Sequence, residues 1–149
     1  MSFTWEEFSE SDKEYPEEIV NKTIEGFSKA TKGLVELVVR KLDGTSAFAS
    51  GLGSDFSFRI YLVSPILVDY RFKILDFGYD VKMTPIFYKM ESEIHDEIYG
   101  TDDFFNSSDV RTIKNEDFVE ELQKIFKTQI FIDLVSGLMK IASKAQTEF

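Results

Sequence analysis

The stretch DFSFRIYLV, residues 55–63, carries the clearest pattern in the chain. Its apolar side chains occupy every second position, at Phe56, Phe58, Ile60 and Leu62. Other side chains fill the positions between them, at Ser57, Arg59 and Tyr61. Successive side chains of a β-strand point to opposite faces of its sheet, so this alternation predicts a strand with one buried face.

Three further stretches extend this prediction to a sheet. Residues 34–42 (LVELVVRKL) are rich in β-branched side chains, which strands favour. Residues 67–77 and 79–89 repeat the alternation of residues 55–63. Gly78 lies between these two stretches, and we expect a hairpin turn there. Such short connections favour antiparallel pairing, because a parallel pair needs a longer crossover.

Helix signals flank the predicted strands. Pro16 is typical of a first helical turn, and apolar residues recur after it at helical spacing, so we expect a helix over about residues 17–31. Asn115 is a typical cap residue, and apolar side chains follow it at four-residue steps to about residue 144. This region predicts one long helix, or two helices joined near Thr128-Gln129.

The order of these elements, one helix, a run of strands and a C-terminal helical region, indicates the α+β class. We predict an antiparallel sheet of about four to five strands, with the N-terminal helix and a long C-terminal helix, or two, packed on it. No repeat or linker divides the sequence, so we expect one domain over residues 1–149. Residues 46–55 are predicted to form a flexible loop, and residues 90–115 a long connection or short irregular helices.

Composition and motifs exclude several chemistries. The chain has no cysteine, which removes disulfides, thiolate nucleophiles and cysteine-ligated metals. Asp76-Phe77-Gly78 and Gly51-Leu52-Gly53 match fragments of kinase and phosphate-loop motifs, but no HRD catalytic loop occurs. A G-x-S-x-G nucleophile elbow is also absent from the sequence. We therefore favour a protein without enzymatic activity and expect no cofactor.

Neither export nor membrane insertion is indicated. The first residues, MSFTWEEFSESDKEYPEE, lack the basic and apolar regions of a secretory signal. The most apolar window, residues 125–142, contains Lys127, Asp133 and Lys140, which are too many charges for a membrane span. We expect a soluble protein in the cytoplasm.

The net charge of -10 is unevenly distributed along the chain. Residues 1–18 hold seven acids and one lysine, and residues 91–121 hold eleven acids and two basic residues. Nucleic-acid binding needs a dominant patch of Lys and Arg, so we expect no nucleic acid to bind through a basic patch. Acidic surfaces favour cationic partners, and the partner that we predict is a basic protein.

The densest acidic stretch, ESEIHDEIYGTDD at residues 91–103, contains the only histidine. We predict that its acids form an exposed, partner-binding surface, made of Glu91, Glu93, Asp96, Glu97, Asp102 and Asp103. The alternative is a metal site, because Glu91 and His95 would share one face of a helix and offer a carboxylate and an imidazole to one ion. The spacing matches neither the calcium-loop nor the H-E-x-x-H motif, so we interpret His95 as incidental to a solvated acidic segment.

Three functions are compatible with these patterns. The first is a non-catalytic acidic interaction protein that binds a cationic protein, as an immunity protein or inhibitor would neutralise a basic nuclease toxin. The second is a small-ligand-binding or metal-dependent enzyme domain with carboxylates between the sheet and the C-terminal helix. The third is mimicry of DNA by regularly spaced acids. Trp5 and Phe8, in the acidic N-terminal segment, either dock onto the sheet or form an acidic contact, and we expect docking.

Overall fold

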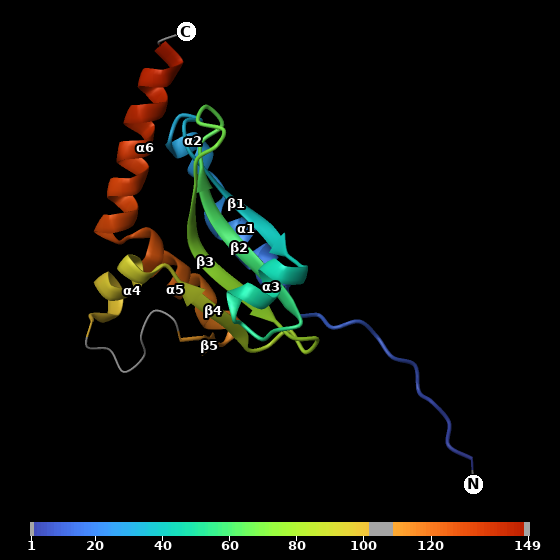
Figure 1. Cartoon of the computed structure of the whole chain (residues 1–149). Helices are drawn as coiled ribbons and strands as arrows, with labels where there is room; N and C mark the ends of the chain where they lie inside the picture. Colours follow the sequence, from blue (N-terminus) through green and yellow to red (C-terminus); the bar gives the residue numbers. More distant parts are fainter. Residues whose placement is uncertain (1, 102–108, 148–149) are drawn as a thin grey trace.

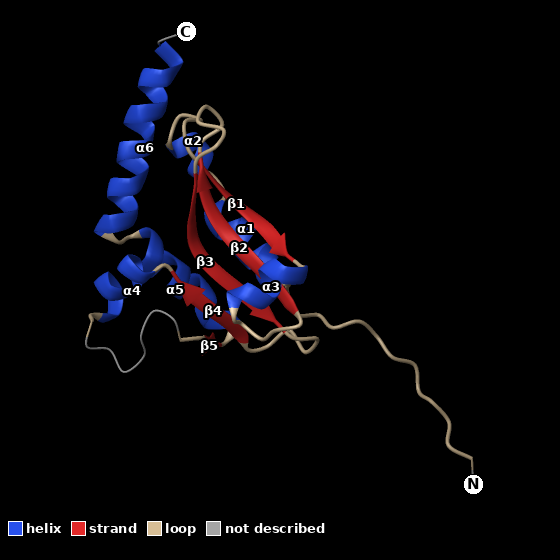
Figure 2. Cartoon of the chain, in the orientation of Figure 1, coloured by secondary structure: helices blue, strands red, loops and turns tan. Residues whose placement is uncertain are grey.

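A five-stranded antiparallel sheet forms the centre of the computed structural model, which describes residues 2–101 and 109–147 (Figures 1 and 2). The strands lie in sequence order across the sheet. They are β1 (Glu36–Leu42), β2 (Phe56–Val63), β3 (Arg71–Tyr79), β4 (Ile86–Met90) and β5 (Arg111–Ile113). Each strand pairs antiparallel with the next, which confirms the predicted α+β class and the antiparallel sheet.

Six helices accompany the sheet in the described part of the chain. They are α1 (Pro16–Ile24), α2 (Phe27–Ala30), α3 (Gly44–Ser50), α4 (Ser92–Tyr99), α5 (Asn115–Phe126) and α6 (Gln129–Thr147). Helices α1 and α5 cover one face of the sheet, whereas α3 lies across one end of the other face (Figure 1). We call the face opposite α1 and α5 the open face. None of the described helices is both long and apolar enough to cross a membrane.

The hydrophobic core lies between the sheet and helices α1 and α5. Ile60 and Leu62 of β2 are fully buried there, which confirms the buried face predicted from residues 55–63. Phe77 of β3 stacks on Phe58 with ring centroids 5.4 Å apart, and Phe118 of α5 packs on Phe77 at 5.7 Å. These rings connect the sheet to the helical layer, and burying large aromatic surfaces is a main source of folding free energy.

The predicted helix over residues 17–31 is two helices in the structure. Helix α1 ends at Ile24, and α2 begins at Phe27. Gly26 stands between them with a φ of 86°, in the left-handed region that glycine adopts readily. The prediction was wrong here because the helical spacing of apolar residues continues through a glycine that ends the helix.

The hairpin predicted between residues 67–77 and 79–89 is present, because β3 and β4 pair antiparallel, but its turn does not lie at Gly78. Strand β3 runs through Gly78 to Tyr79, and the turn follows at residues 80–85, where the Met83 N–H donates to the Asp80 carbonyl at 2.7 Å. A Cβ on Gly78 would lie 2.1 Å from Ser54 Oγ and 2.4 Å from the carbonyl oxygen of Phe56. The glycine is therefore needed because another segment packs against it, rather than because the chain turns there.

Two short elements occupy segments that we expected to be irregular. Helix α3 overlaps the predicted loop over residues 46–55, and β5 lies inside the predicted connection over residues 90–115. Strand β5 pairs with β4 over three residues, too few for an alternating pattern to be visible. The C-terminal region agrees with its prediction, because α5 and α6 are separate helices that meet near Thr128-Gln129.

Candidate functional site

Helix α4 holds most of the acidic segment that we predicted to bind a partner. Two of its acids act as caps at the beginnings of helices. The Glu91 carboxylate accepts a hydrogen bond from the Ile94 N–H at 2.9 Å, at the N-terminus of α4. The Glu97 carboxylate accepts from the N–H groups of Gln129 (2.6 Å) and Ile130 (2.9 Å), at the N-terminus of α6. Each cap satisfies backbone donors that have no partner inside their own helix.

The other four acids of the predicted surface are placed differently. Glu93 and Asp96 are exposed on α4. Asp102 and Asp103 lie outside the described residues. Binding of a partner by this set stays a prediction, and two of its members, Glu91 and Glu97, also serve as helix caps.

His95 is buried, with 2% of its surface exposed, although we interpreted the segment that contains it as a solvated acidic one. Its Nε2 accepts a hydrogen bond from Arg111 Nη2 at 3.3 Å, and its Nδ1 donates to Asp96 Oδ1 at 3.1 Å. Both ring nitrogens of His95 therefore have a polar neighbour, one on β5 and one on α4. Among the described residues, no three His, Asp or Glu side chains are placed to hold a metal ion. A metal site at Glu91 and His95 stays the untested alternative.

His95 belongs to a polar cluster that joins four elements. The Tyr99 hydroxyl donates to Glu121 Oε1, and the Arg111 guanidinium lies 4.1 Å from the centre of the Tyr99 ring. Burial, followed by the nearby charge of Glu121, raises the pKa of Tyr88. Burial and the hydrogen bond to Glu121 raise the pKa of Tyr99 to about 12. The phenols are therefore protonated near neutral pH, where they donate hydrogen bonds rather than act as bases.

Sequence reasoning missed this cluster because its members come from distant segments: β4, α4, β5 and α5. The four-residue spacing of His95 and Tyr99 was the available signal, since it places both rings on one face of a helix. Their ring centroids are 5.5 Å apart in the structure.

A groove between α1 and α5 brings together the two acidic regions of the sequence. It has a volume of about 590 Å³. Its lining residues are Lys13, Glu14, Ile19, Thr84, Asn115, Glu116 and Val119. An adjoining hollow shares Glu14, Ile19 and Val119 with it and continues along the same two helices. We call the two together the acidic groove. Its apolar floor is formed by Ile19 and Val119.

Both helices beside the acidic groove begin with acids, and one of these acids, Glu116, lines the groove. Glu17 and Glu18 lie in the first turn of α1, and Glu116 and Asp117 lie in the first turn of α5. Acids there are stabilised by the partial positive charge of a helix N-terminus. The Tyr79 hydroxyl donates to the Glu17 carboxylate at 2.8 Å, which orients that acid. Glu14 pairs with Lys22, which neutralises only part of the charge.

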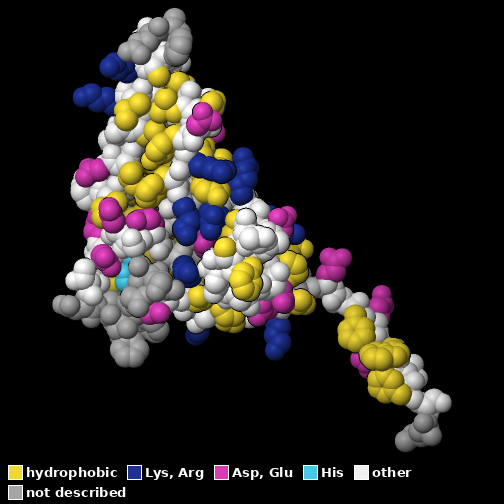
Figure 3. Space-filling model, in the orientation of Figure 1, with side chains coloured by type: hydrophobic (Ala, Val, Ile, Leu, Met, Phe, Trp, Pro, Cys, Tyr) yellow, Lys and Arg dark blue, Asp and Glu magenta, His cyan; other side chains and the backbone are white. Residues whose placement is uncertain are grey.

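The open face of the sheet has the opposite charge. Its register places five basic residues on this face: Arg40, Arg59, Arg71, Lys73 and Lys89. Figure 3 shows Lys and Arg side chains gathered in this region. We call these five residues the basic patch. The sequence does not reveal the basic patch, because its residues alternate along the strands with residues of the buried face. No run of basic residues is therefore visible.

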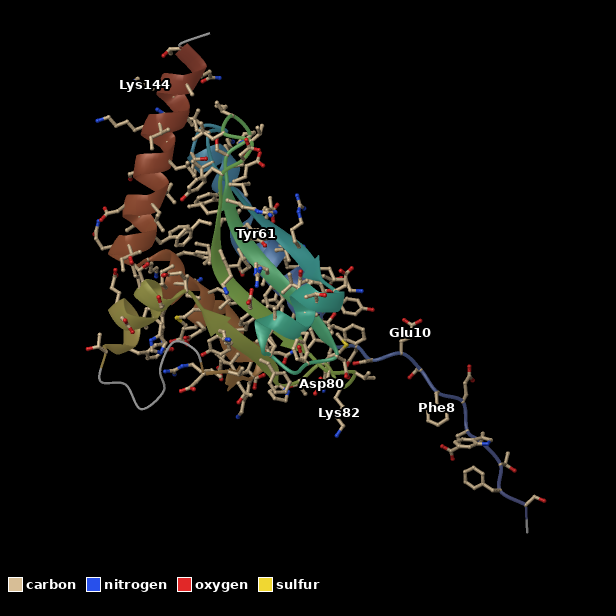
Figure 4. All side chains as sticks on the ribbon, viewed as in Figure 1. Phe8, Glu10, Tyr61, Asp80, Lys82 and Lys144 are labelled. Carbon is tan, nitrogen blue, oxygen red and sulfur yellow. The ribbon has the colours of Figure 1, made fainter. Side chains whose placement is uncertain are left out.

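One buried ion pair and one aromatic ring organise the basic patch. The Arg59 guanidinium donates to both oxygens of the Asp76 carboxylate, at 2.6 and 3.1 Å, and Asp76 is 1% exposed. Tyr61 lies on the same face (Figure 4), with the guanidinium carbons of Arg59 and Arg71 at 5.8 and 5.3 Å from its ring centre. These contacts fix the orientation of the arginines before any partner binds.

The N-terminal segment corrects another expectation, because its aromatic residues do not dock onto the sheet. Trp5 and Phe8 are 75% and 80% exposed. The segment extends away from the body of the protein (Figures 1 and 4). The chain thus has an acidic groove on its helical layer, a basic patch on its open face and an exposed acidic arm. Comparison of the chain with protein-family models, curated proteins and solved structures found no match in any of the three.

Proposed function

We propose that this is a non-catalytic interaction protein whose acidic groove binds a basic segment of another protein. The observation that carries the proposal is the convergence of two acidic regions, far apart in sequence, on one groove. Glu14 comes from the acidic residues 1–18, and Glu116 comes from the acidic residues 91–121. Lys13 and Lys22 also line the groove, and Lys22 pairs with Glu14. Complementary charge accelerates association and selects against partners of the wrong charge.

The floor of the acidic groove favours a polypeptide over a simple cation. Val119 is 38% exposed, and Ile19 lies beside it on the other helix. A basic segment with interspersed apolar side chains would cover this floor while its Lys or Arg residues approach the acids at the edges. An apolar centre with a polar, charged rim is the usual arrangement of a protein-binding site.

Catalysis by paired carboxylates has less support. The buried carboxylates among the described residues are Asp76 and Glu121. Asp76 lies on the open face with Arg59, and Glu121 lies on the helical side with Tyr99. The two belong to opposite faces of the sheet, so they do not converge on one cavity.

The proposal is tested with two charge-reversal variants of equal size. Glu116→Lys with Glu120→Lys changes exposed acids of α5, at or next to the acidic groove. Glu93→Lys with Asp96→Lys changes two exposed acids of α4 by the same charge. Asp96 also contacts the buried His95, so circular dichroism verifies that this variant is folded. Wild type and both variants are immobilised, exposed to lysate of the source cells, and eluted with rising salt. We expect to capture a basic protein that binds wild type and the α4 variant but not the α5 variant. This protein should cross-link to α1 or α5.

The same experiment can contradict the proposal in two ways. A partner retained by the α5 variant and lost by the α4 variant would place the binding site on the acidic segment of residues 91–103. Capture that does not weaken with salt in any of the three proteins would contradict an electrostatic site, because exposed charge pairs are screened at high ionic strength.

A further inference from the structure

The N-terminal arm, residues 2–12, is acidic and aromatic. It contains four acids, Glu6, Glu7, Glu10 and Asp12, and no basic residue. Its aromatic side chains are those of Phe3, Trp5 and Phe8, which are 78%, 75% and 80% exposed. The Phe3 and Trp5 rings are 5.0 Å apart, and the Trp5 and Phe8 rings are 6.0 Å apart. Such a group of aromatic side chains in water marks an interaction site, because burying it is strongly favourable.

The open face holds a groove whose properties complement those of the arm. Its volume is about 330 Å³, and we call it the sheet groove. Tyr61, Val68 and Tyr70 give it apolar surface, and Arg40 and Arg71 give it positive charge. Val68 is 82% exposed, so its apolar surface faces solvent in the single chain. Large exposed apolar side chains next to arginines are typical of a protein-binding surface.

The charges of the arm and of the sheet groove are opposite in sign. Glu36 is the acid that lines the sheet groove, beside its two arginines. Arg59 on β2 and Lys73 on β3, the strands of Tyr61 and Arg71, extend the positive region toward Asp76, which they partly neutralise. The four acids of the arm can approach this positive region. Its aromatic rings can cover the apolar surface around Tyr61. Arginine side chains also interact favourably with the faces of aromatic rings. Trp5 can therefore contact both the apolar surface and the arginines of the sheet groove.

The base of the arm lies on the side of the molecule opposite the sheet groove. Lys13 and Glu14 line the acidic groove beside α1 and α5, and Glu14 pairs with Lys22 of α1. The buried Pro16 then begins α1. The arm would have to turn around the sheet to reach the open face of its own chain. Residues 2–12 span about 36 Å when extended, and they point outward, where the groove of another molecule can meet them.

We propose that the arm of one molecule docks in the sheet groove of a second copy, so that the protein self-associates through its N-terminus. This inference goes beyond the proposed function, because it uses the arm and the open face rather than the acidic groove. Reciprocal docking closes a symmetric dimer, and docking in one direction builds a chain of copies.

Trp5 allows docking to be measured directly, because it is the only tryptophan. We expect the full-length protein to sediment as a larger species as its concentration rises. Its tryptophan emission should shift to shorter wavelength over the same range, as Trp5 leaves water. Deleting residues 2–12 should abolish the concentration dependence. Arg40→Glu with Arg71→Glu should raise the dissociation constant of self-association at least about tenfold, because both charges of the groove are reversed.

Mixing two defective variants gives the decisive experiment. The deletion variant keeps an intact sheet groove, and the Arg40→Glu, Arg71→Glu variant keeps an intact arm. Neither should self-associate, but together they should form a 1:1 complex in which Trp5 emission shifts. Lys29→Glu with Lys127→Glu is the matched control, because it reverses two exposed lysines outside the open face. This control should associate as wild type does.

Three outcomes would overturn the proposal. The first is a wild-type protein that stays monomeric with the emission of a fully exposed tryptophan at every concentration. The second is a shifted Trp5 emission that does not depend on concentration, which would mean that the arm docks on its own chain. The third is equal loss of association in the groove variant and the Lys29, Lys127 control, which would indicate a general effect of charge. Circular dichroism verifies that each variant is folded.

Discussion

The backbone around Gly78 leaves no room for a larger side chain. A Cβ at this position would approach the Phe56 carbonyl oxygen to 2.4 Å, and that oxygen belongs to the backbone of the neighbouring strand β2. The Ser54 side chain, at 2.1 Å, could rotate away, but the strand cannot move without disturbing its pairing with β3. One hydrogen atom in place of a methyl group therefore lets residues 54–56 close over the end of β3.

Gly78→Ala should lower the free energy of unfolding by about 2 kcal/mol, because overpacking a tight site forces a shift of the backbone. Gly137→Ala is the matched control: its Cβ meets nothing within 4 Å, and it lies in α6. That change should raise the free energy of unfolding by up to about 1 kcal/mol, because alanine favours helix more than glycine does. Urea unfolding followed by circular dichroism measures both. Equal effects of the two substitutions would contradict the close approach at Gly78.

The same residue explains one limit of the sequence analysis. A glycine between two alternating stretches can indicate either a turn or a position in a strand where another segment packs closely. Only the partner decides between them, and Ser54 and Phe56 lie more than twenty residues away in sequence. By contrast, the alternation of residues 55–63 correctly predicted the buried face, because strand periodicity depends on local neighbours alone.

At the scale of elements, one side chain of α4 joins the acidic segment to the long C-terminal helix. Glu97 accepts hydrogen bonds from the first two N–H groups of α6, and Thr128 Oγ1 accepts from the third, that of Phe131, at 3.2 Å. Helix N-termini leave such donors without partners inside the helix. The start of α6 is therefore satisfied by one residue of its own linker and one residue of α4.

Glu97→Ala should lower the free energy of unfolding by about 1 kcal/mol, the usual effect of losing an N-terminal cap. Glu93→Ala removes the same charge from an exposed position of the same helix and should change it by less than about 0.5 kcal/mol. Hydrogen exchange gives a local measure: amide exchange in the first turn of α6 should accelerate in the Glu97 variant and not in the Glu93 variant. Unchanged exchange there in both variants would contradict the capping role.

Elements with a strong internal period could be predicted, and elements defined by their partners could not. The repeat of apolar residues at four-residue steps predicted helix from Asn115 to about residue 144, as one helix or as two joined near Thr128-Gln129, and the structure has two. Strand β5 has only three residues and exists because β4 offers it a pairing edge. In the same way, the sequence predicted Glu97 to be an exposed acid of the surface. Its role as a hydrogen-bond acceptor depends on the position of the first turn of α6 in space.

At the scale of the whole molecule, the net charge of -10 conceals two surfaces of opposite sign. The sequence indicated the acidic regions, because their acids are neighbours along the chain. It could not indicate the acidic groove, which needs α1 and α5 to pack side by side. It also could not indicate the basic patch, because the five residues of the patch are distributed over four strands. Total charge therefore describes the solubility of a protein better than it describes the partners of its individual faces.

Stability at high pH depends on the tyrosines of the fold. Burial raises the pKa of Tyr79, Tyr88 and Tyr99 above the ordinary value of 10, and that of Tyr99 reaches about 12. A group whose pKa is higher in the folded state binds its proton more tightly there. Its contribution to stability is complete below pH 10 and is lost as pH rises through the folded pKa. We therefore expect the free energy of unfolding to fall as pH rises above about 10, where the unfolded tyrosines ionise first.

Tyr99→Phe separates this titration from other effects of alkali. The variant loses the hydrogen bond to Glu121, so it should be less stable than wild type near pH 8. Phenylalanine does not ionise, so the stability of the variant should fall less steeply than that of wild type between about pH 10 and 12. Urea unfolding at a series of pH values gives both curves, which should run parallel below pH 10 and converge above it. Parallel curves up to pH 12 would show that Tyr99 ionises equally in the folded and unfolded chain, and so contradict the burial of its hydroxyl against Glu121.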